Sequence, residues 1–180
     1  MPSERILYRK IQVVLDEARR DQASTLEELA ENIQKRSPLN FTYFNVRLGK
    51  RAVVEVCKTE TIRKTIDICV DLNLINGDTA KLTPWGRKAV DPNYYDSTLR
   101  QQLKNALERF DMGVVKIEKT IQKMLAEAKP DRIPTWDAIS DEFDLKSHDR
   151  EKFHSYLTLL GMCKGITYSL KKIYLPKSSK

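Results

Sequence analysis

The chain contains an internal repeat. Without gaps, residues 11–33 align with residues 121–143 at an offset of 110, and seven of the aligned positions are identical. An offset of 88 aligns Leu72–Ile75 with Leu160–Cys163, which close helical stretches. The first copy therefore carries about 22 extra residues around positions 37–56. A repeat of this length indicates two copies of one structural unit, which fits a chain of 180 residues.

The first copy predicts three helices followed by a β-hairpin. The first helix covers residues 3–20, and the second opens at a capping box formed by Ser24 and Glu27. Apolar residues at helical spacing predict a third helix over residues 59–72. Short strands at 74–75 and 80–82 flank Asn-Gly-Asp, a sequence typical of a tight hairpin turn. The extra residues 40–56 suit an additional hairpin, apolar on one face.

The second copy predicts the same order of elements. Helices are expected over residues 114–129, 135–143 and 147–160, and a hairpin over 166–170 and 172–175. Between the copies, residues 97–111 form an amphipathic helix. We interpret it as a connector, and its apolar stripe also suits pairing of two chains.

The positive charge lies in two segments. The chain carries 32 Lys and Arg against 25 Asp and Glu, a formal net charge of +7. Residues 35–64 and 152–180 each carry +6, whereas the remaining 121 residues are net −5. Positive charge concentrated in two segments favours an anionic partner such as nucleic acid.

Composition excludes several other classes of protein. No window approaches the roughly 20 consecutive apolar residues that a membrane span needs, so we expect no membrane partner. Charged residues at the N-terminus do not suit a signal peptide, and we expect a cytoplasmic protein, associated with the nucleoid or, in a eukaryote, nuclear. Cys57, Cys69 and Cys163 are expected as buried free thiols, because their number and spacing suit neither disulfides nor a zinc site.

Three helices and a hairpin, in that order, resemble the winged helix-turn-helix arrangement. Asp71–Ile75, the Asn-Gly turn and Leu82–Gly86 are similar to the run that leads from the third helix through the wing in winged-helix DNA-binding proteins. The second copy lacks the Thr and Gly of this run. The resemblance implies a mainly α fold with small β-hairpins (α+β), made of two winged-helix units joined by a connector helix. The expected boundaries are 1–91 with the insert at 37–56, 92–112 for the connector, 113–176, and a basic tail at 177–180.

The resemblance also implies how such a protein meets double-stranded DNA. In winged-helix proteins the third helix enters the major groove and the wing touches the backbone. The base-contact candidates lie on the two expected third helices: Thr61, Arg63 and Lys64, and Ser147, His148, Arg150 and His154. The phosphate-contact candidates are the basic residues of the insert and of the second wing: Arg47, Lys50, Arg51, Lys171 and Lys172. The expected function is non-enzymatic DNA binding, in transcription regulation or in a larger complex, without cofactor or metal.

Two alternatives stay open. Tandem winged helices also serve as scaffolds for protein–protein interaction, so the partner can be a protein instead of DNA. Pro130-Asp131 followed by Asp144-Leu145-Lys146 matches the bare motif of Mg²⁺-dependent nucleases, although a helical pattern separates its halves. Trp85 and Trp136 are expected in the core, and Tyr94 and Tyr95 either stack on a base or pack beneath the connection.

Overall fold

The computed structural model describes residues 3–47, 50–55, 57–109, 147–163, 167–169 and 172–174, together with positions 119 and 123. Residues 48, 49, 56 and most of 110–146 lie outside the described part, and with them the helices expected at 114–129 and 135–143 and the nuclease motif. The chain divides into two compact units, Arg5–Thr98 and Leu99–Lys180 with Met1–Glu4. The division falls inside the expected connector. No helix in the described ranges is both long and apolar enough to cross a membrane.

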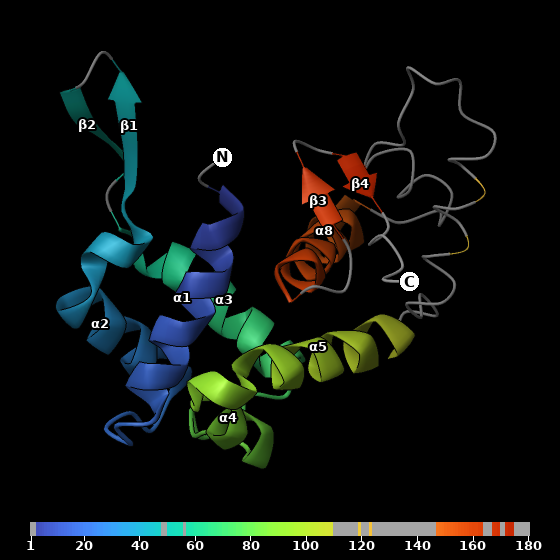
Figure 1. The fold of residues 1–180 in the computed structure, drawn as a ribbon. Helices are drawn as coiled ribbons and strands as arrows, with labels where there is room; N and C mark the ends of the chain where they lie inside the picture. The colour runs from blue at the N-terminus through green and yellow to red at the C-terminus, as the bar shows by residue number, and fades with distance from the viewer. Residues whose placement is uncertain are drawn as a thin grey trace. The chain divides into compact units, whose positions relative to one another are not determined.

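Three helices form the core of the first unit (Figure 1). They are α1 (Ser3–Ala18), α2 (Leu26–Arg36) and α3 (Thr59–Asp71), close to the ranges predicted from periodicity. Their apolar stripes are fully or almost fully buried and supply most of the core, as expected for amphipathic helices. The largest of these side chains are Ile11, Leu15, Leu29, Ile33, Ile62 and Ile66.

The start of α2 differs from the prediction by one residue. Thr25, not Ser24, is the N-cap, and its hydroxyl accepts a hydrogen bond from the amide of Glu28 at 3.2 Å. The Glu28 carboxylate in turn accepts a hydrogen bond from the amide of Ser24 at 2.7 Å. Two amides that have no partner within the helix are satisfied in this way. The capping box therefore pairs Thr25 with Glu28 instead of Ser24 with Glu27.

The expected wing after α3 is reduced to a single β-bridge between Ile75 and Leu82. Asn73 ends α3 with φ 53°, and the amide of Leu74 donates to the carbonyl of Cys69 at 2.8 Å, a Schellman ending. On the other side, Thr83 caps a new helix, α4 (Pro84–Ala89), directly after Leu82. A helix end and a helix start so close together leave no length for two strands.

The loop inside this bridge is closed by Asn76. Its side-chain oxygen accepts hydrogen bonds from the backbone amides of Asp78 (2.9 Å) and Thr79 (3.0 Å). Its backbone amide donates to the backbone carbonyl of Lys81 at 2.8 Å. These are the contacts of an Asx turn, which Asn favours. The loop is a compact turn and not a projecting hairpin.

Strands occur in two other places. The hairpin expected in the insert is present as β1 (Tyr43–Arg47) paired antiparallel with β2 (Lys50–Glu55), with an irregularity between Tyr43 and Phe44. In the second unit, β3 (Thr167–Ser169) pairs antiparallel with β4 (Lys172–Tyr174). Each pair is a separate two-stranded ribbon.

The prediction of an α+β fold of two winged-helix units joined by a connector helix is therefore wrong. The described residues are mostly helical, and no strand pair extends from α3 in the manner of a wing. The physical reason is that a helix begins at Pro84, with Thr83 as its N-cap, directly after Leu82. A Thr followed by Pro is a favourable N-cap and first helical position, and the Thr83 hydroxyl accepts from the amide of Gly86 at 3.0 Å.

The second unit contains the longer part of α5 (Pro92–Arg109) and α8 (Ser147–Met162). Arg100 Nε on α5 donates to the carbonyl of Cys163 at 2.9 Å, at the end of α8. The apolar stripe of α5 is buried within the chain itself, and self-association through residues 97–111 stays a prediction. The buried residues of this unit include Leu99, Leu103, Ala106, Leu107, Phe153, Tyr156 and Leu159.

At Gly86, α4 packs closely against the chain that leaves α3. A Cβ atom at this position would overlap the carbonyl oxygen of Leu74. We expect Gly86→Ala to lower the free energy of unfolding by about 2 kcal/mol or more, because backbone must move to admit the methyl group. Urea denaturation measures this change. Gly77→Ala is the matched control, since its Cβ would meet only a Val70 side-chain carbon at 3.3 Å; equal losses in both variants would contradict the account.

Candidate nucleic-acid interface

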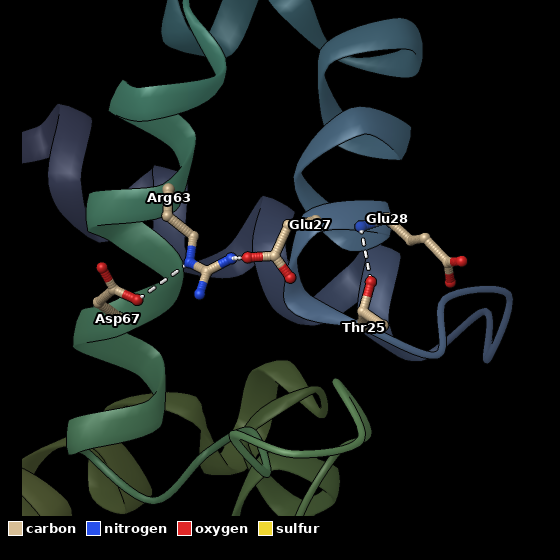
Figure 2. Close-up of polar contacts among 5 residues, drawn as sticks. All are labelled: Thr25, Glu27, Glu28, Arg63 and Asp67. Atoms are coloured by element: carbon tan, nitrogen blue, oxygen red, sulfur yellow. Dashed lines mark hydrogen bonds and ion pairs between the residues drawn. The ribbon is translucent and has the colours of Figure 1, made fainter.

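Arg63, a predicted base contact, bridges two helices of the first unit. Its Nη1 donates to Glu27 on α2, and its Nε lies 3.3 Å from Asp67 Oδ1, one turn further along α3 (Figure 2). Its guanidinium group therefore faces two carboxylates. In this arrangement Arg63 links α2 to α3.

The charges of this bridge alter the ionisation of both partners. A backbone hydrogen bond and the hydrogen bond from Arg63 lower the pKa of Glu27 below its ordinary value of 4.5. Burial alone would lower the pKa of Arg63, but the hydrogen bonds that it donates to Glu27 and Asp67 outweigh this effect and raise that pKa. Both shifts favour the charged pair, as expected for opposite charges in contact.

Gln34 makes a second link between the same helices. Its Nε2 donates to the carbonyl of Cys57 at 3.2 Å, and its Oε1 accepts from the hydroxyl of Thr59 at 3.0 Å. The start of α3 is thus held against α2 at one end of the pair, and Arg63 holds it further along. These contacts fix the orientation of α3 on α2.

The other two base-contact candidates of α3 differ in exposure. Thr61 is half-buried and Lys64 is exposed. Within α3, Arg63 and Lys64 are outnumbered by Glu60, Asp67 and Asp71. The helix is therefore net negative, which disfavours its approach to phosphate.

Ion pairs also occupy part of the first basic segment. Arg36 Nη1 lies 2.5 Å from Glu17 Oε1, whose side chain is only 6% exposed, and Arg36 Nη2 donates to Gln22 at 2.5 Å. Lys35 pairs with Glu31 at 3.6 Å. Arg36 in particular supports the turn between α1 and α2.

The phosphate-contact candidates of the insert are brought together by the β1–β2 ribbon. Arg47 is the register partner of Lys50, and Arg51 is the partner of Val46. Three basic residues therefore occupy the last two rungs of the ribbon. Arg47 and Lys50 are directly opposite each other, and like charges at such positions repel, so a bound anion would favour this register.

The remaining candidates belong to the second unit. Ser147 and His148 begin α8, while Arg150 is half-buried and His154 is exposed one turn later on the same side of the helix. Lys172 begins β4 opposite Ser169, and Lys171 lies outside the described residues. The candidates thus form separate groups in two units.

The three cysteines are buried and free, as the sequence predicted. Burial raises the pKa of Cys57, although nearby Lys10 acts in the opposite direction, and burial also raises the pKa of Cys69. A thiol that resists ionisation is a poor nucleophile and a poor metal ligand. Among the described side chains, no group of three or more His, Cys, Asp and Glu residues is placed to hold a metal ion.

One surface was missed by the sequence interpretation. Trp85, expected in the core, is 38% exposed on α4, and Lys88 lies over its ring at 5.9 Å. The Thr83-Pro84 pair could have revealed a helix start here, and with it the outward position of Trp85. Trp136 lies outside the described residues.

Comparison with models of protein families, with curated proteins and with solved structures finds no match for this chain.

The Arg63–Glu27 contact makes stability depend on pH. A carboxyl whose pKa is lower in the folded state stabilises above its ordinary pKa, and this contribution is lost as the pH falls through the folded value. We expect the urea concentration at the unfolding midpoint to decrease as the pH is lowered below about 4.5. In Glu27→Gln this decrease should be smaller. Glu31→Gln, which changes a well-exposed pair, is the control. An identical pH profile for Glu27→Gln and the parent would contradict this role.

Proposed function

We propose that this protein binds double-stranded DNA without catalysing a reaction on it, as a transcription regulator or as the DNA-recognition part of a larger complex. The observation that carries the proposal is the group of Arg47, Lys50 and Arg51 on the last two rungs of the β1–β2 ribbon. Basic residues brought together at such a position suit the phosphate backbone, which dominates the affinity of DNA-binding proteins.

The shape of the ribbon also supports DNA as the partner. The major groove of B-DNA accommodates an α-helix or a two-stranded antiparallel β-ribbon. Since Arg63 faces Glu27 and Asp67, and α3 is net negative, we assign the main contact to β1–β2 and a secondary phosphate contact to Lys64. Lys172, the first residue of β4, and Lys171, which precedes it in the sequence, are proposed as further phosphate contacts.

Binding through phosphates makes affinity depend on salt. If about six phosphates are neutralised, log K against log salt should have a slope of roughly −5. Titration of the full chain with random-sequence duplex DNA at several salt concentrations measures this slope. A complete lack of binding at low salt would contradict the proposal and favour a protein partner.

Reversing two charges on the ribbon tests where DNA binds. The double variant Lys50→Glu, Arg51→Glu should bind duplex more weakly and reduce the size of the salt slope by about 2, since roughly two phosphate contacts are lost. The control is Lys35→Glu, Lys104→Glu, which makes the same change in net charge at two exposed helical positions. Equal weakening in both double variants would show only a general charge effect and would exclude the ribbon as the main site.

A further inference from the structure

Two exposed aromatic rings flank one lysine in the first unit. Lys88 Nζ lies 5.9 Å from the centroid of the Trp85 ring and 5.5 Å from that of the Tyr94 ring. Trp85 is 38% exposed and Tyr94 is 50% exposed. We call these three residues the aromatic–lysine patch.

The exposure of these rings follows from how α4 and α5 pack. Gly86 and Ala89 face inward on α4, which leaves Trp85 and Lys88, three residues apart, on its outer side. On α5, Tyr95 is buried and its hydroxyl donates to the carbonyl of Tyr8 at 2.9 Å, whereas its neighbour Tyr94 faces solvent. The burial of Tyr95 therefore anchors the helix that presents Tyr94.

The patch also carries positive charge. Arg87 and Lys88 are both exposed, and no ion pair within the described residues involves either of them. Asp91 is the nearest acidic residue in sequence, and its carboxylate accepts a hydrogen bond from the amide of Asn93 at 2.9 Å, at the start of α5. An anion that also presents a flat apolar face would complement both the cations and the rings.

We propose that the aromatic–lysine patch binds single-stranded nucleic acid. Unpaired bases stack on Trp85 and Tyr94, and Lys88, with Arg87, contacts the adjoining phosphates. Aromatic platforms combined with cations are how proteins hold unpaired strands without reading their sequence. An acidic peptide is the competing occupant, but lysine is depleted in protein–protein interfaces, whereas both features here suit a nucleotide.

This site goes beyond duplex binding by the β1–β2 ribbon, because it needs unstacked bases. The two proposals use different residues, and each can fail without the other. Single-stranded DNA and RNA share the required chemistry, so the experiment includes both.

Tryptophan fluorescence tests the patch directly. The chain has two tryptophans, so Trp136→Phe leaves Trp85 as the only reporter. Adding a 12-residue oligothymidylate or oligouridylate at low salt should quench Trp85 in a saturable way, with the tighter of the two identifying the preferred strand. In the otherwise unmodified chain, Trp85→Ala and Tyr94→Ala should each weaken binding of the oligonucleotide roughly 5- to 100-fold, the range expected for the loss of one stacking partner.

Controls separate stacking from general attraction. Leu39→Ala removes another large exposed apolar side chain and should leave oligonucleotide binding unchanged. The Trp85→Ala variant should still bind duplex. The double variant Lys50→Glu, Arg51→Glu should lose duplex affinity, and in the Trp136→Phe background it should retain quenching of Trp85 by the oligonucleotide. Absence of quenching in the Trp136→Phe protein would overturn the proposal, as would equal quenching by polyglutamate, which would assign the patch to an acidic protein.

Discussion

The contact between Gly86 and the carbonyl of Leu74 determines how the chain continues after the three-helix core. Because no side chain stands at residue 86, α4 lies directly against the segment leaving α3. Thr83 caps α4 immediately after Leu82, so the chain between α3 and α4 makes one β-bridge and no longer ribbon. The same packing turns Trp85 and Lys88 outward. The Thr83 cap and this close approach together account for the absence of a wing at this position and for the aromatic–lysine patch.

The polar contacts of α3 separate its structural role from the proposed interface. Arg63 is held between Glu27 and Asp67, and Gln34 holds the start of the helix. Exposed ion pairs contribute little free energy each, so their importance here is that they occupy the guanidinium group. The basic rungs of β1–β2 then become the stronger candidates for phosphate. On this account, duplex binding depends on the ribbon and single-strand binding on the patch.

The sequence predicted the elements that rest on long periodic patterns. Ranges for α1, α3 and α8 were close to those observed, and the hairpin in the insert was expected from its alternation around Leu48–Arg51. The sequence wrongly predicts a wing because Asn76-Gly77-Asp78 suits a hairpin turn and Leu82–Gly86 resembles the end of a wing, although Thr83-Pro84 is also a helix start signal. A turn does form at Asn76, but the helix end at Asn73 and the helix cap at Thr83 leave no room for strands on either side of it.

The candidate site was harder to predict than the fold. Periodicity placed Arg63 on an outer face of its helix, but a pattern within one helix does not reveal a carboxylate supplied by another, here Glu27. Similarly, the exposure of Trp85 depends on how α4 packs, whereas composition alone suggests that a tryptophan is buried.

Hydrogen–deuterium exchange of the full chain, with and without random-sequence duplex DNA at low salt, tests the central claim most directly. It reports which backbone amides the duplex protects. Our account predicts slower exchange in the β1–β2 ribbon, residues 43–55, and little change in α3, residues 59–71. Protection of α3 with no change in the ribbon would contradict it.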